Sequence, residues 1–395
     1  MTDVLTPANE DEVAGIVADA NRSRQPLAVV GGGTLTDLGR PTQTARTLQL
    51  SRLAGVTLYE PTELVLSARA GTPLAEIEKL LASKGQRLPF EPMDHRPLLG
   101  GTNEPTIGGI VSANVSGPRR IQAGAARDSL IGLRAVTGKG EIVKSGGRVM
   151  KNVTGYDLVK FLAGSYGTLA VLTEVTFKVL PAPEAETTLV ISGLEDVRAV
   201  EALSKALGSP FSVTGAAHRP AFGREPARTF VRLEGFDASV AYQSARLATD
   251  LSGFGAVECL GREASTGFWR GIRDGEFPDC DPKTLIWRLS TKPANGPVVL
   301  DTIRKSFDCR ALYDWGGGLV WIAGGEGNDG GAAVIRAAVG AVGGHATLVR
   351  APRDVRGAIE VFEPLDPALM ALTRQLKQLF DPGGILNPGR MYEGV

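Results

Sequence analysis

Hydrophobic and polar positions alternate with two different periods in the first 180 residues. A capping box formed by Asn9 and Glu12 precedes apolar residues at helical spacing, so a helix is expected there. Pro26–Val30 predicts a short buried strand that leads directly into the glycines of Gly31–Thr34. Later apolar runs predict three more strands, at Thr47–Leu50, Val56–Tyr59 and Leu64–Arg69, and a second helix over Leu74–Leu81.

The pattern changes after the stiff junction Leu180–Pro183, where we place a domain boundary. From there to residue 350, apolar runs follow the order strand, helix, strand, strand, helix, strand, and this order occurs twice. Two successive βαββαβ units predict a ferredoxin-like antiparallel sheet backed by helices, and hence an α+β chain. The predicted domains are residues 1–181, residues 182–350 and a C-terminal segment, 351–395, that returns to the first domain.

A last helix is expected after Asp366–Pro367, because this pair combines a cap with a first-turn proline. Its apolar face is expected to lie in the core, and the alternative is that the same face docks a second subunit. That face consists of Leu369, Leu372, Leu376, Leu379 and Phe380. The stretch FDPGGILNPGRMY follows, and its prolines and glycines demand a specific backbone path.

Composition narrows the class of protein. Of the 395 residues, 50 are glycine, close to twice the usual share of about 7%. No G-X-Y period is present and 43% of the residues are hydrophobic, which excludes collagen and low-complexity chains. The 43 basic and 43 acidic residues balance, so nothing favours binding to nucleic acid. The glycines are therefore expected in turns and where the backbone approaches a ligand.

Membrane, metal and disulfide signals are weak. No apolar run reaches the roughly 20 residues of a membrane span, and the N-terminus is acidic where a signal peptide is basic. Three cysteines without metal spacing predict free thiols and a cytoplasmic location, at Cys259, Cys280 and Cys309. No metal site is expected from three widely separated histidines, His95, His218 and His345. We interpret His95 as a residue of a surface loop.

The first glycine-rich segment is VVGGGT, Val29–Thr34. Consecutive glycines after a strand leave backbone N–H groups uncovered, an arrangement that suits a phosphate or pyrophosphate. The Rossmann fingerprint does not fit because no third glycine stands at the required spacing and no amphipathic helix follows before Pro41, and no Gly-Lys-Ser/Thr closes a Walker A loop. A plain tight turn remains the alternative.

Two further glycine-rich segments follow. In Gly100–Arg120, small hydroxyl and amide side chains alternate with bare backbone, and Arg119 and Arg120 either add charge for a phosphate or are simply solvated. In Gly146–Pro181, Gly164 and Gly167 precede a strand, which is typical of a loop against a flat ligand. Lys151 and Tyr156 are candidate catalysts there, although a strand–helix connection explains them equally well.

These three segments, in this order, resemble the FAD-binding domain of the vanillyl-alcohol oxidase type, which p-cresol methylhydroxylase flavoproteins share. The runs GVTLYEPTELVLSARAGTPLAEIE, GQRLPFEP, SGPRR, VMKNVTGYDL and YDWGGGLVW narrow the resemblance. They are similar to the FAD-binding accessory (E) subunits of bacterial glycolate oxidase, or glycolate dehydrogenase, over nearly the whole chain. This resemblance implies a two-part FAD-binding domain with a ferredoxin-like cap.

The resemblance also implies which residues hold FAD. The first loop would bind the pyrophosphate, and the second segment would contact pyrophosphate and ribityl. The strand after Gly167 and the terminal NPG turn would lie near the flavin or adenine. The implied cofactor-binding residues are Val30, Gly31, Gly32, Gly33, Thr34, Leu35, Thr106, Gly108, Gly109, Ser112, Asn114, Glu174, Val175 and Asn387.

The sequence lacks several residue patterns that its relatives carry, and each missing pattern changes an expectation. The first loop has no histidine for a covalent flavin link, so FAD is expected to be noncovalent. The His-x-His and Glu-His pattern by which related 2-hydroxyacid dehydrogenases hold a metal is missing, so no metal and no catalytic side chain are named. Cysteine spacing for an iron–sulfur cluster is missing too, so any cluster would belong to a partner.

The resemblance therefore implies an FAD-dependent oxidoreductase subunit that acts on CH–OH donors. The expected complex oxidises glycolate to glyoxylate, contains a catalytic FAD subunit and an iron–sulfur subunit, and passes electrons to an acceptor other than oxygen. It would be cytoplasmic, and partner subunits would allow association with the inner face of the membrane. The alternatives are a self-sufficient flavin oxidoreductase and a non-catalytic scaffold.

Overall fold

The computed structural model describes residues 3–147, 157–277, 280–281, 283–325 and 329–395. Its contacts divide the chain into two compact units. Unit 1 comprises residues 1–116, 123–182 and 364–395, and unit 2 comprises residues 117–122 and 183–363. Two segments thus group differently from the expected domains. Residues 117–122 belong to unit 2, and the C-terminal part of unit 1 begins at Pro364 rather than at residue 351.

Unit 1 contains a parallel three-stranded sheet in the order β1-β3-β2 and an antiparallel five-stranded sheet in the order β4-β5-β9-β7-β8. The first sheet is built from β1 (Asp3–Leu5), β2 (Leu27–Val30) and β3 (Arg46–Gln49). The second is built from β4 (Val56–Glu60), β5 (Val65–Arg69), β7 (Leu130–Thr137), β8 (Ile142–Gly146) and β9 (Ala170–Lys178). A small ladder joins β6 (Gln86–Arg87) to β10 (Leu180–Pro181).

The first helix of unit 1 begins where the capping signal predicts. Asn9 caps the first helix, because its Oδ1 accepts a hydrogen bond from the Glu12 N–H at 2.9 Å. The other helices are short, apart from α2 and the C-terminal helix. The helices that lie wholly in unit 1 are α1 (Glu10–Ser23), α2 (Leu74–Ala82), α3 (Arg96–Leu99), α4 (Ile107–Ser112), α6 (Ala126–Ser129), α7 (Leu158–Leu162) and α14 (Pro367–Phe380). A further helix, α5 (Arg120–Ala123), spans the passage of the chain from unit 2 back to unit 1.

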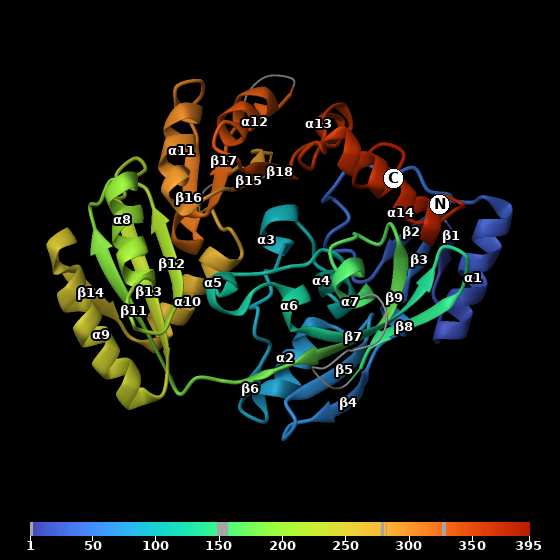
Figure 1. The fold of residues 1–395 in the computed structure, drawn as a ribbon, viewed down its shortest axis with the longest axis horizontal. Coiled ribbons are helices and arrows are strands. Elements are labelled where there is room, and N and C mark those ends of the chain that lie inside the picture. Colours follow the sequence, from blue (N-terminus) through green and yellow to red (C-terminus); the bar gives the residue numbers. More distant parts are fainter. Residues whose placement is uncertain (1–2, 148–156, 278–279, 282, 326–328) are drawn as a thin grey trace. The chain divides into compact units, whose positions relative to one another are not determined.

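Unit 2 confirms the two βαββαβ repeats. Its antiparallel sheet has eight strands in the order β14-β11-β13-β12-β16-β17-β15-β18. Figure 1 shows α8 and α9 beside the strands of the first repeat, and α11 and α12 beside those of the second. The first repeat runs through β11 (Ala185–Ser192), α8 (Asp196–Leu207), β12 (Val213–Arg219), β13 (Arg228–Gly235), α9 (Asp237–Leu251) and β14 (Val257–Leu260). The second runs through β15 (Ile286–Ser290), α11 (Gly296–Arg304), β16 (Arg310–Asp314), β17 (Leu319–Ala323), α12 (Ala332–Gly340) and β18 (His345–Arg350), followed by α13 (Arg353–Ala358).

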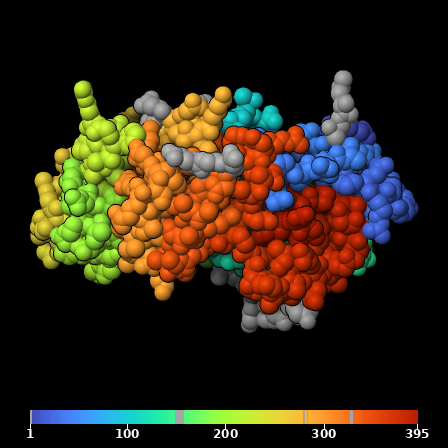
Figure 2. Space-filling view, turned by 90° about the horizontal axis from the view of Figure 1, so that it is seen from above, coloured from blue at the N-terminus to red at the C-terminus, as the bar shows by residue number. Residues whose placement is uncertain are grey.

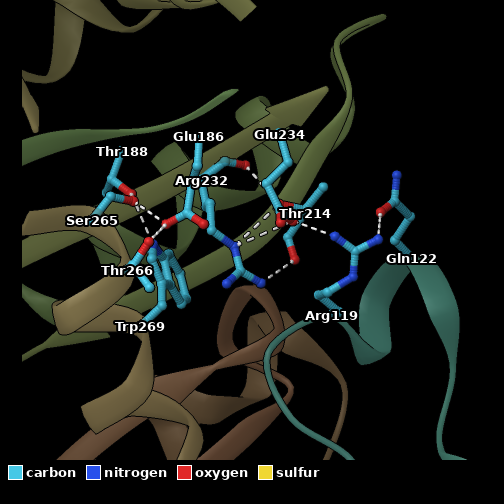
Figure 3. A network of polar contacts seen from close by, with 10 residues as sticks. All are labelled: Arg119, Gln122, Glu186, Thr188, Thr214, Arg232, Glu234, Ser265, Thr266 and Trp269. Carbon is cyan, nitrogen blue, oxygen red and sulfur yellow. Dashed lines mark hydrogen bonds and ion pairs between the residues drawn. The ribbon is translucent and has the colours of Figure 1, made fainter. Parts of the chain in front are cut away.

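The two faces of the first-repeat sheet differ in chemistry because side chains alternate along each strand. Leu189, Ile191, Val231 and Leu233 point to one side and form an apolar core with α8 and α9. The alternate positions carry a polar network against α10 (Arg262–Arg273), which Figure 3 shows. There, the indole Nε1 of Trp269 donates to Thr188 Oγ1 at 2.8 Å.

Arg119 belongs to this polar network. It forms a hydrogen-bonded ion pair with Glu234, and Arg232 Nε lies 3.7 Å from the same carboxylate oxygen (Figure 3). All three side chains are almost fully buried. Arg120 lies over the ring of Trp315, 5.0 Å from its centroid. Arg119 therefore neutralises a buried glutamate of unit 2. Neither of the two interpretations of the arginine pair, a phosphate contact or simple solvation, describes this residue.

The core assignment of the α14 face is wrong for three of its five residues, while Leu376 and Phe380 are half-buried. Leu369, Leu372 and Leu379 are 45%, 49% and 62% exposed. In Figure 2 the red surface formed by the C-terminal residues is broad and open to solvent. The alternative, that this face docks a second subunit, stays a prediction.

The side of α14 that is buried carries Lys377 instead. Its Nζ donates to the Thr168 and Leu386 carbonyls at 2.7 and 2.9 Å and pairs with Asp381 at 2.8 Å. Burial lowers the pKa of Lys377, and the Asp381 carboxylate opposes that shift. Hydrophobic periodicity pointed to the wrong face because a long lysine stem can pack like an apolar residue while its ammonium binds backbone carbonyls.

Candidate functional site

A cleft lies within unit 1, and segments far apart in the sequence form it. Most of the residues that the family resemblance implied come together here. The implied residues that line the cleft are Val30, Gly31, Gly32, Gly33, Thr34, Leu35, Thr106, Gly108, Gly109 and Ser112.

The first glycine loop packs directly against the segment before α4. An ideal Cβ built on Gly32 would lie 1.7 Å from the Glu104 carbonyl oxygen, and one on Gly31 would lie 2.1 Å from Thr106 Oγ1. Gly33 has φ +81°, a left-handed conformation that glycine adopts without strain. The three glycines therefore let two loops from different parts of the chain form one continuous wall.

Hydrogen-bond donors along this wall suit a pyrophosphate. The N–H groups of Gly31 to Thr34 donate to no protein atom within the described residues. At the start of α4, the N–H groups of Ile107 and Gly108 donate to the Thr72 and Ala70 carbonyls, which leaves the Gly109 N–H toward the cleft. Unpaired backbone donors of this kind form an anion-binding concavity.

Thr106 adds a donor of a different kind. Its Oγ1 is buried and has no hydrogen-bond partner among the described residues. A buried hydroxyl without a partner costs about 1–3 kcal/mol, which a ligand oxygen at this position would recover. The uncovered amides, this hydroxyl and the close glycine packing together fit the phosphates of FAD.

Four of the implied residues lie outside the cleft lining: Asn114, Glu174, Val175 and Asn387. Asn114, at φ +48°, accepts a hydrogen bond from the Arg127 N–H through Oδ1 at 3.0 Å, so its side chain holds the loop after α4. Val175 is fully buried in β9, and Glu174 precedes it with Arg69 and Arg134 as cross-strand neighbours. The same strand contributes Ala170 and Leu172 to the cleft.

Asn387 stands behind the cleft rather than in its lining. Its Oδ1 accepts a hydrogen bond from the Val29 N–H at 2.8 Å, and its Nδ2 donates to the Tyr166 carbonyl at 2.9 Å. Its own N–H donates to the Leu27 carbonyl at 3.0 Å. Asn387 thus connects the strand that leads into the first glycine loop with the Tyr166–Gly167 turn, and both border the cleft.

Replacing Asn387 with alanine is expected to weaken FAD binding about tenfold, because two half-buried backbone groups lose their partners. Asn387→Asp keeps the acceptor for Val29 and tolerates φ +42°, but it puts a carboxylate oxygen where Nδ2 donates to the Tyr166 carbonyl, so it should weaken FAD binding at least as much. Flavin fluorescence titration measures the affinity. Asn295→Ala, which removes one side-chain bond to the Val342 carbonyl in unit 2, is the control. Unchanged affinity in Asn387→Ala would refute this positioning role.

Several residues of the cleft were not predicted from the sequence. His95 lines it from the half-buried loop before α3, a role that its interpretation as a surface-loop residue did not include. Met93, Tyr166 and Arg390 also border the cleft, and Arg390 donates to the Leu35 carbonyl at 2.6 Å. Arg390 follows the NPG turn that was expected to return to the first domain, and this position was the available signal. Lys151 and Tyr156 lie outside the described residues.

Metal ligands, disulfide bonds and membrane-spanning helices find little support in the described parts of the chain. They contain no group of three or more His, Cys, Asp or Glu side chains that could hold a metal ion. The cysteines Cys259, Cys280 and Cys309 are free thiols. No helix among the described residues is both long and apolar enough to cross a membrane.

The families and proteins to which this chain is similar include FAD-binding proteins, in agreement with the donor-lined cleft. A family model described as FAD binding domain matches residues 2–146, and one for the C-terminal domain of FAD linked oxidases matches residues 359–391. The glycolate oxidase subunit GlcE of Escherichia coli (strain K12) is 37% identical over 380 residues, which are 95% of each chain.

More distant relatives match about half of the chain. The glycolate oxidase subunit GlcD of Bacillus subtilis (strain 168) is 32% identical over 47% of this chain and 38% of its own. D-lactate dehydrogenase of Archaeoglobus fulgidus is 31% identical over 48% of this chain and 41% of its own. Among solved structures, alkyldihydroxyacetonephosphate synthase superimposes with a TM-score of 0.71 at 18% identity, covering 98% of this chain and 75% of its own, which shows a shared fold.

Proposed function

Because the chain belongs to the FAD-linked oxidase family that includes the glycolate oxidase subunit GlcE, we propose that it is the FAD-binding subunit of a glycolate-oxidising complex. The observation that carries this proposal is similarity to that subunit over 95% of both chains. The donor-lined cleft of unit 1 is where the cofactor would bind. Bound FAD supplies two-electron acceptance and one-electron release.

The residues of this chain bind and orient the cofactor. The amides of Gly31 to Thr34, the Gly109 N–H and the Thr106 hydroxyl would donate to the pyrophosphate oxygens. Asn387 keeps the first loop and the Tyr166–Gly167 turn in register. No covalent link is expected, because the histidine that lines the cleft, His95, lies outside the first loop. Glu174 and Val175 stay predicted contacts for a more distant part of the cofactor, as does Asn114.

The substrate chemistry is assigned to a partner. In our proposal a homologous flavoprotein subunit removes hydride from glycolate, and an iron–sulfur subunit carries single electrons to an acceptor other than oxygen. Partner subunits would also account for any association with the cytoplasmic face of the membrane.

Reconstitution of the purified chain with FAD tests the cofactor assignment. We expect a yellow protein with one FAD per chain, released on acid precipitation because the flavin is noncovalent. A colourless chain after reconstitution would refute FAD binding. Turnover of glycolate by the isolated chain with a dye acceptor would instead favour the self-sufficient oxidoreductase. Flavin counts for each subunit of the purified complex then show whether this chain carries its cofactor in the assembled enzyme.

A further inference from the structure

Unit 2 contains a second hollow, which shares no residue with the FAD cleft. It lies where β12 ends and β16 begins. These two strands are neighbours in the sheet, with His218 paired to Tyr313 (Figure 1). Arg219 is the last residue of β12, Arg310 is the first of β16, and Arg304 ends α11, so three elements bring three arginines to one cavity.

Aromatic rings and a carboxylate position these arginines. The Arg310 guanidinium lies 4.4 Å from the centroid of the Phe222 ring, and the Arg219 guanidinium lies 5.7 Å from that of Phe268. Arg304 Nη1 lies 3.4 Å from Asp196 Oδ2. Stacking on a ring fixes the plane of a guanidinium and leaves its N–H edges directed sideways, which is the geometry that binds a carboxylate.

The opposite charge is present in the same wall. Glu225 and Glu276 line the cavity with the arginines. The pKa of Arg219 nevertheless lies below its usual value, because burial removes water from the guanidinium and because Arg310 and Arg228 repel it. Glu225 and Glu276 act in the other direction without restoring the ordinary pKa. The arginines of the cavity therefore favour an anionic group. The two glutamates disfavour a ligand whose polar atoms all carry negative charge.

We propose that this cavity binds a small carboxylate that also carries a hydrogen-bond donor, such as a hydroxy acid or an amino acid. The carboxylate accepts hydrogen bonds from the Arg219 and Arg310 guanidinium groups, and the hydroxyl or ammonium group donates to the Glu225 or Glu276 carboxylate. The apolar wall that includes Phe222 and Leu312 excludes larger polar ligands. The proposal involves no chemical step and does not depend on FAD binding.

Isothermal titration of the full chain with four probes tests the proposal. Glycolate and glycine carry both groups, acetate carries only the carboxylate, and inorganic phosphate is negative all round. We expect glycolate or glycine to bind at one site per chain and more tightly than acetate or phosphate. Tighter binding of glycolate would identify a hydroxyl as the preferred hydrogen-bond donor of the ligand, and tighter binding of glycine would identify an ammonium group. Tighter binding of phosphate, or no binding of any probe, would overturn the proposal.

Variants locate the binding. Arg310→Met is expected to weaken the better probe about tenfold or more, because a charge-assisted hydrogen-bonded pair is lost. Glu225→Gln should weaken glycolate or glycine and strengthen acetate, since the repulsion disappears with the charge. Phe222 is 44% exposed, so Phe222→Leu should fold even if Arg310→Met does not, and it should weaken binding several-fold.

Two controls separate this site from other effects. Arg198→Met removes an exposed ion pair with Glu201 elsewhere in unit 2 and should leave binding unchanged. Gly32→Ala, which alters only the FAD cleft, should also leave it unchanged, so a failure of FAD binding does not affect this result. Equal affinity in the native chain, Glu225→Gln and Phe222→Leu would refute the assignment of the ligand to this cavity.

Discussion

Replacing Gly32 with alanine is expected to abolish FAD binding, with a loss of affinity of about 100-fold or more. The new Cβ would lie 1.7 Å from the Glu104 carbonyl oxygen, and that neighbour is backbone rather than the end of a flexible side chain. One of the two loops must move away, and the donors of Gly31 to Thr34 then no longer face the same ligand as Thr106 and Gly109. Misplacing several donors at once removes several charge-assisted hydrogen bonds to the pyrophosphate.

The matched control is Gly101→Ala, in the loop before α4. A Cβ at Gly101 has no atom within 4 Å, so this variant should bind FAD like the native chain. Flavin fluorescence titration gives both affinities, and circular dichroism reports whether each chain remains folded. Native affinity in a folded Gly32→Ala chain would show that FAD does not use this wall.

The second large effect is expected from Glu234→Gln, which should lower the free energy of unfolding of unit 2 by about 3–5 kcal/mol. Glutamine keeps the shape of the side chain but removes its charge. The buried guanidinium groups of Arg119 and Arg232 then share a site without the carboxylate that neutralises them. A buried charge that loses its partner is costly because burial has already removed its water.

Two comparisons make the measurement by denaturant unfolding specific. Arg119→Met should cost less than Glu234→Gln, because Arg232 still neutralises Glu234. Arg198→Met breaks an exposed pair with Glu201 and should cost about 1 kcal/mol or less. If Glu234→Gln proved no more destabilising than Arg198→Met, the buried triad would contribute nothing through its charges.

Local signals in the sequence predicted much of the fold. The capping box at Asn9, the strand before Gly31 and the two βαββαβ repeats all depend on neighbours close in sequence, and the structure confirms them. The segments of the cleft could be named because glycine has a clear physical role wherever backbone meets backbone. Gly31 and Gly32 illustrate this role, and the backbone that packs against them is the Glu104–Thr106 segment of the same chain.

The failures have a common physical cause, which is that tertiary contacts decide them. Nothing near Arg119 in the sequence announces Glu234, which lies more than a hundred residues away and neutralises its charge. The leucines of α14 follow a perfectly good apolar period, yet the helix docks through Lys377 because three oxygen atoms surround its ammonium group. His95 lies among prolines and acidic residues, a context typical of exposed loops, and reaches the cleft only through the path of that loop.

The route of the chain also determines when the cofactor can be loaded during biosynthesis. Leu27 donates its N–H to the Ile385 carbonyl, Val29 is fastened by Asn387, and Arg390 holds Leu35. A ribosome makes these C-terminal residues only after it has made all of residues 183–363, so unit 2 can fold while the first glycine loop still lacks its support. FAD loading is therefore a late step, and a nascent chain stalled before residue 385 should carry a folded unit 2 and no flavin.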